Sequence, residues 1–324
     1  MSYSFDYLIE KINNSSFQDR PFKHVYIENF FSDEHFEEII NCSEISIPVC
    51  NNDDDLFNEL FQAGYKIINF PGCINDIETY KSWRNGVDLK GLNNTATESF
   101  GMTLRLYEPE SSIITELRNF IGSKEFNNAI ALKGGIEIES CTLDNGIQKY
   151  LDGYEISPHP DIRRKAATFM VNINPSKNSE DETYHTHYMK FKEDFKFVEN
   201  FWQNNEEYDR AWVPWEWCET EYQQKKNNSI VLFYPSNKTI HAIKSDYNHL
   251  TGQRTQLYGN IWHPEQPMKH APWEELENIN NGSLSLSLKQ RLKNSIKKHI
   301  KIASNKNGTS LSAKETDNTS KRNY

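Results

Sequence analysis

The sequence has few cysteines and does not arrange them as disulfide scaffolds or cysteine-based metal sites do. The five cysteines are odd in number and form no C-x-x-C pair; they are Cys42, Cys50, Cys73, Cys141 and Cys218. This pattern excludes a small disulfide-stapled scaffold and a zinc ribbon, and we expect a reduced environment.

The sequence also lacks a long apolar run. No stretch approaches the ~20 residues that a membrane-spanning helix needs. The first residues, MSYSFDYLIEKINN, do not place a charged stretch before an apolar one, as secretory signals do. We therefore expect a cytoplasmic protein without a transmembrane segment.

Positive charge is scarce in most of the chain. The whole sequence has 36 Lys/Arg and 46 Asp/Glu, a net charge of −10. Residues 283–324 hold ten of the Lys/Arg and two of the Asp/Glu, which leaves 26 against 44, or −18, in residues 1–282. A polyanion would be repelled by this part of the chain, so nucleic acid is an unfavourable partner for it.

The basic segment 283–324 is predicted to begin as an amphipathic helix. Apolar residues recur at every fourth position among Lys and Arg, at Leu284, Leu288, Leu292, Ile296 and Ile300. Such a helix fits docking on the acidic body, on an acidic partner or at a membrane surface, and these alternatives stay open. The residues after Ala303 are polar and are expected to be disordered.

The order of elements predicts an α+β chain. Residues 22–31 alternate as a strand, and a helix follows with Ser32 as its N-cap. Residues 51–100 are interpreted as polar and irregular, 99–109 as a strand, and 111–135 as one or two helices. Strand patterns separated by turns then dominate to about residue 265, which is typical of an antiparallel sandwich or barrel.

We interpret residues 1–282 as a single domain whose β core spans about 100–265. Residues 176–228 are interpreted as an insertion in that core, rich in aromatic and charged residues. A long loop inside a domain often forms a lid or a substrate wall; a packed side elaboration is the alternative.

His159 and Asp161, in YEISPHPD, are candidate metal ligands. Residues i and i+2 of a strand point to the same face, so both side chains could bind one ion. Pro160 between them cannot donate to a sheet ladder, which predicts a strand end or an edge strand.

His241, in a strand flanked by polar turns, is the candidate third ligand. Two histidines and one carboxylate on one side of an ion form the facial arrangement of non-haem Fe(II) oxygenases. His185 and His187 are a weaker candidate pair because they lie in a charged segment interpreted as a loop.

Arg254 follows His241 by thirteen residues, and the intervening SDYNHLTGQ has the composition of a hairpin turn. We therefore expect the strand of Arg254 to lie beside that of His241. Alternation predicts one common face for Arg254, Gln256, Tyr258, Asn260 and Trp262. An inward-facing arginine with few acids nearby needs an anionic ligand, and its planar fork suits a small dicarboxylate.

The segments QKYLDGYEISPHPD, NSIVLFYPSNKTIHAIKS and RTQLYGNIW together resemble the 2-oxoglutarate- and Fe(II)-dependent oxygenases, in particular the prolyl-4-hydroxylase-like branch. The resemblance covers roughly residues 22–40 and 100–265. It implies a double-stranded β-helix, or jelly-roll, with flanking N-terminal helices. It also implies Fe(II) as the metal, 2-oxoglutarate and dioxygen as co-substrates, and ascorbate as a candidate further cofactor.

Residue by residue, the resemblance implies that His159, Asp161 and His241 bind iron and that Arg254 binds the distal carboxylate of 2-oxoglutarate. Tyr150 and Asn172 occupy positions that often line the co-substrate pocket. The sequence departs from the family in placing Gln256 where a serine is common. Its spacings from His159 to His241 and from His241 to Arg254 are also long.

The function predicted from these residues is a dioxygenase that hydroxylates a peptidyl residue, an amino acid or another small molecule, with release of succinate and CO2. Two alternatives use the same fold: a cupin-like metal-dependent hydrolase or isomerase, which leaves Arg254 without a role, and a non-catalytic binding protein. A nucleic-acid demethylase is disfavoured by the charge of residues 1–282.

Overall fold

A computed structural model describes residues 3–86, 96–208 and 211–267. Its α-helices are α1 (Tyr7–Asn14), α2 (Asp33–Asn41), α3 (Asp53–Gln62), α4 (Ile77–Gly86), α5 (Ser112–Ile121), α6 (Lys124–Gly134) and α7 (Lys196–Gln203). Its strands are β1 (Phe17–Gln18), β2 (His24–Glu28), β3 (Tyr65–Ile67), β4 (Thr103–Leu106), β5 (Thr142–Tyr150), β6 (Glu155–Pro160), β7 (Lys165–Asn172), β8 (His187–Phe191), β9 (Cys218–Gln223), β10 (Ser229–Phe233), β11 (Ile240–Lys244) and β12 (Arg254–Trp262).

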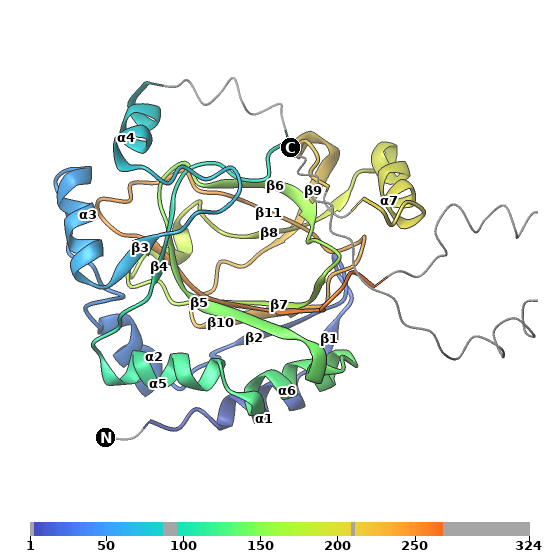
Figure 1. Ribbon diagram of the computed structural model, residues 1–324, viewed down its shortest axis with the longest axis horizontal. Helices are drawn as coiled ribbons and strands as arrows, with labels where there is room; N and C mark the ends of the chain where they lie inside the picture. The colour runs from blue at the N-terminus through green and yellow to red at the C-terminus, as the bar shows by residue number, and fades with distance from the viewer. Residues whose placement is uncertain (1–2, 87–95, 209–210, 268–324) are drawn as a thin grey trace, which may run out of the picture. The chain divides into compact units, whose positions relative to one another are not determined.

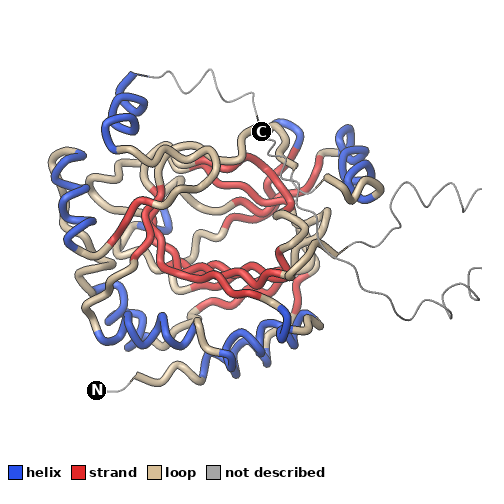
Figure 2. The backbone as a smooth tube through the Cα atoms, in the orientation of Figure 1, coloured by secondary structure: helices blue, strands red, loops and turns tan. Residues whose placement is uncertain are grey.

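The strands form two antiparallel sheets that face each other (Figure 1). The larger sheet has the order β1-β2-β10-β7-β12-β5-β4-β3, and the smaller one has the order β6-β11-β8-β9. Figure 2 shows that the helices lie outside this pair of sheets. The predicted α+β class with an antiparallel β core is confirmed.

The outer face of the larger sheet is covered by α1, α2, α5 and α6 (Figure 1). Helix α5 turns four aliphatic residues into this core: Ile113, Ile114, Leu117 and Ile121. The Ser123 side chain caps α6 by accepting from the Phe126 N–H, and Gly135 ends it at a φ of 69°, which glycine tolerates. The helices predicted over 111–135, and the Ser32 cap of α2, are confirmed.

The expectation that residues 51–100 are irregular is wrong for much of this segment. It contains α3, β3 and α4. Helix α3 is capped by the Asn52 side chain and buries Leu56, Phe57 and Leu60 on one face. The polar residues between these positions face outward. The helix has only ten residues and begins with three aspartates, so its amphipathic pattern is hard to recognise in the sequence.

Residues 176–228 are not one long loop outside the sheets. They supply β8 and β9, which make up half of the smaller sheet, and β8 pairs directly with β11. Helix α7 packs Val198 and Trp202 into an apolar cluster with Met189, Phe191 and Ile240 of that sheet. The aromatic residues of this segment therefore form a second core, and His187 opens a strand rather than lying in a loop.

The predicted hairpin between His241 and Arg254 is also wrong. Strand β11 belongs to the smaller sheet, whereas β12 pairs with β5 and β7 in the larger one. The connection between them crosses from sheet to sheet, and its first residue, Ser245, exchanges backbone hydrogen bonds with Gly153 and Tyr154. Arg254 therefore faces the strand of His241 from the opposite sheet.

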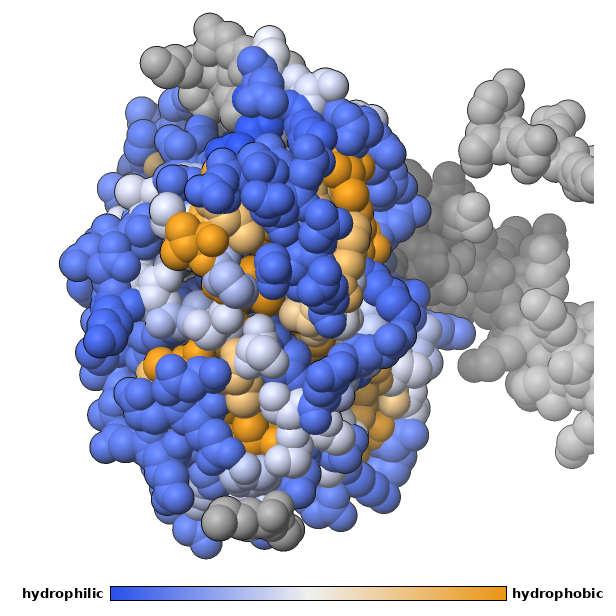
Figure 3. Space-filling model, turned by 90° about the vertical axis from the view of Figure 1, so that its left-hand side faces the viewer, coloured by the Kyte–Doolittle hydropathy of each residue, from blue (hydrophilic) through white to orange (hydrophobic). Residues whose placement is uncertain are grey.

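The face drawn in Figure 3 is mainly hydrophilic, and its hydrophobic areas are separate patches. Within the part of the chain that the structure describes, no helix combines the length and the apolar character needed to cross a bilayer. The basic helix and tail predicted for residues 283–324 lie outside the described residues.

Lys149, on the outer face of β5, is a fully buried cation. Its ammonium group donates to the Ile45 carbonyl at 2.7 Å and to Thr255 Oγ1 at 2.9 Å, and no carboxylate among the described residues pairs with it. Burial lowers the pKa of Lys149 to about 7. A neutral amine is therefore favoured in the folded state at alkaline pH.

We predict that the free energy of unfolding rises with pH because of Lys149. Between pH 7 and the usual lysine pKa, the unfolded chain binds a proton at this position that the folded chain does not, so stability increases with pH. The gain between pH 7 and 9 should be about 2 kcal/mol. Lys149→Met should lose this gain, measured by urea unfolding at both pH values. An equal pH dependence in the two proteins would contradict the assignment.

Candidate metal centre

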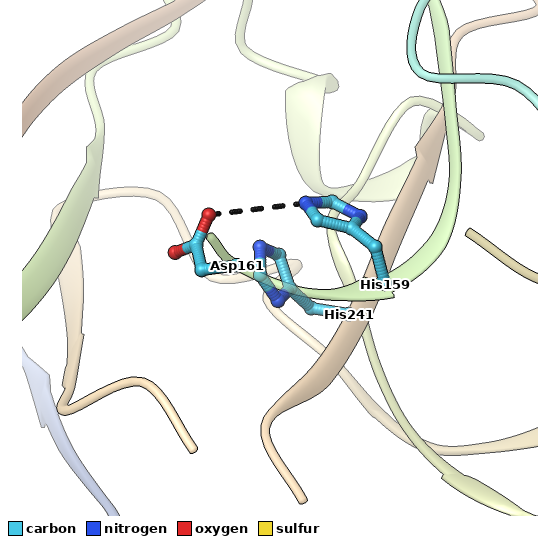
Figure 4. Close-up of side chains that lie close together, drawn as sticks. All are labelled: His159, Asp161 and His241. Carbon is cyan, nitrogen blue, oxygen red and sulfur yellow. Dashed lines mark ion pairs between the residues drawn. The ribbon is translucent and has the colours of Figure 1, made fainter. Parts of the chain in front are cut away.

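His159 and His241 lie opposite each other on neighbouring strands of the smaller sheet. They are register partners in β6 and β11, and their ring centroids are 4.3 Å apart. Strand β6 is an edge strand that ends at Pro160, as the sequence predicts. Asp161 follows at once, so all three side chains meet beside the end of β6 (Figure 4).

Backbone carbonyls fix the tautomer of both imidazoles. His159 Nδ1 lies 2.9 Å from the Ser157 carbonyl oxygen, and His241 Nδ1 lies 2.9 Å from the Thr239 carbonyl oxygen. A carbonyl can only accept, so each neutral ring carries its proton on Nδ1 and keeps the Nε2 lone pair free. Burial, with the neighbouring imidazole, lowers the pKa of His159 to about 3, and burial lowers that of His241.

Asp161 stays ionised although its surroundings are buried. Burial alone would raise its pKa, but the Lys165 ammonium, followed by the two imidazoles, holds that pKa well below its usual range. Lys165 Nζ lies 2.5 Å from Oδ1, and Thr168 donates to Oδ2 at 2.7 Å. His159 Nε2 is 3.9 Å from Oδ1, which is too long for a hydrogen bond.

These three side chains offer ligand atoms that all lie within 4.8 Å of one another. They line a cavity of about 280 Å³ between the two sheets. The larger sheet contributes the alternate residues of β12 that the sequence predicts to share a face: Arg254, Gln256, Tyr258, Asn260 and Trp262. The cavity therefore connects the candidate metal ligands with the candidate co-substrate arginine.

Arg254 is a buried cation. Its side chain is 3% exposed, it donates to Thr186 Oγ1 at 2.9 Å, and its guanidinium lies 4.5 Å from the centre of the Tyr150 ring. Burial lowers the pKa of Arg254. No carboxylate among the described residues pairs with it, so the guanidinium has no direct counter-charge there.

Tyr150 and Asn172 differ in their relation to this cavity. Tyr150 lies opposite Arg254 in the sheet, lines the cavity and donates to Gln148 Oε1 at 2.7 Å. The Asn172 amide donates to the Gln224 carbonyl at 2.8 Å and accepts from Gln256 at 2.9 Å, and Asn172 is not among the lining residues. Asn172 orients Gln256, and its direct contact with a co-substrate stays a prediction.

Three other histidines, His249 and the weaker candidate pair His185 and His187, do not join the three candidate ligands. His249 is fully buried, with Nε2 2.8 Å from Asp53 and Nδ1 accepting from the Asp152 N–H, so both ring nitrogens have partners. His187 Nδ1 lies 2.9 Å from Thr220 Oγ1. Neither His185 nor His187 lines the cavity.

Sequence reasoning missed Thr186, Lys165 and Thr168, which contact Arg254 or Asp161. Lys165 lies four residues after Asp161, and this spacing was the available signal. Thr186 comes from the segment interpreted as a loop, so nothing in the sequence placed it beside Arg254.

The donor set fits a divalent metal ion. Two neutral imidazoles with free Nε2 atoms and one ionised carboxylate lie together, and each Nδ1 has the carbonyl partner that orients a metal-binding histidine. Arg254 fits a carboxylate in the same cavity because a guanidinium binds it through paired hydrogen bonds.

No protein-family model matches the sequence, and no curated protein matches it. Solved structures similar to this chain include a prolyl hydroxylase from Trichoplax adhaerens in complex with a hypoxia inducible factor peptide fragment. It has 12% identity and a TM-score of 0.39 over 80% of this chain and 88% of that one. A prolyl-4-hydroxylase from Pseudomonas putida has 8% identity and a TM-score of 0.38 over 80% and 98%.

Another similar structure is HygX from Streptomyces hygroscopicus with nickel and 2-oxoglutarate bound. Its identity is 7% and its TM-score is 0.29, over 66% of this chain and 87% of that one. The function proposed below is carried by the side chains of the site and not by these similarities.

We predict that His159→Ala and His241→Ala each weaken divalent metal binding by at least about 100-fold, because each removes one of three ligands. His187→Ala is the matched control: it removes a largely buried histidine of β8 and should leave the affinity unchanged. Anaerobic titration with Co(II), followed by its visible absorption, measures this. Loss of binding in His187→Ala together with retention in His241→Ala would overturn the ligand set.

Proposed function

We propose that this chain is an Fe(II)- and 2-oxoglutarate-dependent dioxygenase with a double-stranded β-helix core. The observation that carries the proposal is the combination, in one cavity, of a two-histidine, one-carboxylate cluster and the unpaired Arg254. A three-residue metal site alone is compatible with many activities. The buried guanidinium of Arg254 narrows them to activities in which a carboxylate ligand binds beside the metal.

His159, Asp161 and His241 would hold Fe(II), and Arg254 with Thr186 would hold the distal carboxylate of 2-oxoglutarate. When bound, iron with 2-oxoglutarate and dioxygen supplies oxidative hydroxylation of a C–H bond with release of succinate and CO2. Three ligands from the protein leave positions for the co-substrates.

The chain's own residues prepare this site in three ways. The carbonyls of Ser157 and Thr239 hold both imidazoles in the metal-binding tautomer. Lys165 and Thr168 orient Asp161 and keep it ionised. The Tyr150 ring stacks on Arg254, and Thr186 fixes one of its nitrogens, so the guanidinium is pre-positioned for its ligand.

The cupin-like alternative uses the same three ligands but leaves Arg254 as an uncompensated buried charge. A non-catalytic binding protein would require no intact ligand set. Anaerobic titration with Fe(II) and 2-oxoglutarate distinguishes these hypotheses. If the chain is a 2-oxoglutarate-dependent dioxygenase, a visible charge-transfer band should form only when both components are present. Turnover with Zn(II) and no 2-oxoglutarate would favour the cupin-like hydrolase or isomerase. Failure to bind Fe(II) would favour the non-catalytic binding protein.

Arg254→Met should raise the 2-oxoglutarate concentration needed for half-saturation by at least about 100-fold, because a charge-assisted pair to the carboxylate is lost. Fe(II) affinity should not change. The melting temperature of the protein without co-substrate should not fall, since the substitution removes a buried charge without an anionic partner.

The matched control is Arg118→Met, which removes a half-buried arginine that lies outside the cavity and donates to the Tyr107 carbonyl. Its 2-oxoglutarate requirement should equal that of the wild type. Unchanged saturation in Arg254→Met would contradict the assigned role of this residue.

A further inference from the structure

A second polar cluster lies on the wall of the same cavity, on β4, β5 and β12. Arg105 donates from one terminal nitrogen to Asp144 Oδ1 at 3.0 Å, and its guanidinium lies 5.1 Å from the centre of the Tyr258 ring. The Tyr258 hydroxyl lies 3.4 Å and 3.3 Å from the two carboxylate oxygens of Asp144. None of these residues serves the metal centre or the proposed carboxylate site at Arg254.

Most of the hydrogen-bonding capacity of Arg105 is unused. Asp144 engages one terminal nitrogen; Nε is buried without a partner, and the other terminal nitrogen makes no hydrogen bond to the described residues. A guanidinium placed in this way has donors available for a ligand.

The charges around the cavity decide which ligand suits this cluster. Among the described residues that line it, three are acidic and three are basic: Glu98, Asp144, Asp161, Arg105, Lys165 and Arg254. Lys165 pairs with Asp161, and Arg105 pairs with Asp144. An anion at Arg105 would be repelled by Asp144, whereas a ligand with a carboxylate and an ammonium group would pair with both.

We propose that Arg105 and Asp144 bind the α-carboxylate and the α-ammonium of a free amino acid. This inference rests on the proposed function and names the substrate class of that site. Tyr258 is a positioning residue: its hydroxyl donates to Asp144, and burial, with the Asp144 carboxylate, raises the pKa of Tyr258 and keeps the phenol protonated.

The register of the larger sheet places this cluster at a useful distance from the metal ligands. Asp144 is opposite Asn260 of β12, and Asn260 is opposite Thr168 of β7, which donates to Asp161. Two strand spacings separate β5 from β7, or roughly 10 Å. An amino acid whose head group is held at Arg105 could therefore reach the candidate metal ligands with its side chain.

The reaction on such a substrate is hydroxylation of a side-chain carbon. One oxygen atom of O2 enters the substrate C–H bond as a hydroxyl group, and the other enters the succinate formed from 2-oxoglutarate, with loss of CO2. The two electrons that the substrate C–H bond provides and the two from 2-oxoglutarate reduce O2 fully, so no further reductant is needed in the balanced turnover.

The test compares the common L-amino acids with their N-acetyl and carboxamide forms. Binding to the metal-free protein is measured by saturation-transfer NMR, and binding to the anaerobic Fe(II) and 2-oxoglutarate complex by the shift of the visible band. At least one free amino acid should bind, and blocking either its carboxylate or its ammonium group should weaken that binding by about tenfold or more. Binding of no free amino acid, or equal binding of the blocked forms, would overturn the inference.

Two substitutions assign the contacts. Arg105→Met should weaken binding of the free amino acid by about tenfold or more. Asp144→Asn should make the affinities for the free amino acid and for its N-acetyl form equal. Arg118→Met is the control and should change neither. Circular dichroism shows whether each variant folds. If Arg105→Met does not fold, the result for Asp144→Asn alone decides the test. Full affinity in both cavity variants would overturn the inference.

The two proposals fail in different ways. If Fe(II) and 2-oxoglutarate give no band but an amino acid binds in an Arg105-dependent manner, the proposed function fails while the ligand class stands. If the band forms and no amino acid binds, only the amino-acid inference is overturned.

Discussion

Arg254 is a cation buried between two sheets, and no carboxylate of the part of the chain that the structure describes lies beside it. This unpaired charge is the constraint on which the functional interpretation depends. An uncompensated charge in a protein interior is costly, and an anionic ligand would offset that cost. Thr186 and the Tyr150 ring hold the guanidinium in place without neutralising it.

The candidate metal ligands face this charge from the other sheet, and their geometry follows from backbone positions. Pro160 ends an edge strand, so Asp161 leaves the ladder and turns toward His159 and His241. The Ser157 and Thr239 carbonyls then set both rings. The connection from β11 to β12 crosses between the sheets and is not a hairpin. His241 and Arg254 therefore face each other across the cavity instead of lying on neighbouring strands.

The stability of this arrangement comes from outside the cavity. The outer face of the larger sheet packs under four helices with an aliphatic core, and the smaller sheet packs under α7. Because these two apolar layers supply hydrophobic burial, the cavity between the sheets can also hold charged side chains. Even there the charges are mostly paired, as in Lys165 with Asp161 and Arg105 with Asp144.

Part of this could be predicted from the sequence because it depends on local periodicity. Alternation put His159 beside Asp161 and aligned Arg254 with Gln256 and Tyr258, and the proline marked the strand end. The crossing of the 245–253 connection could not be predicted, because Asn248 and Gly252 occur equally in hairpins. Neither could Thr186 or the pairing of Arg105 with Asp144, since both depend on register between distant strands.

The central claim is that one metal ion and one dicarboxylate share the cavity between the sheets. Crystals grown with Co(II) and 2-oxoglutarate, and measured at the cobalt absorption edge, test it most directly. The account predicts one strong anomalous peak between the Nε2 atoms of His159 and His241 and the Asp161 carboxylate, with a carboxylate of the ligand on Arg254. An ion bound at His185 and His187, or a dicarboxylate that leaves Arg254 without contact, would contradict it.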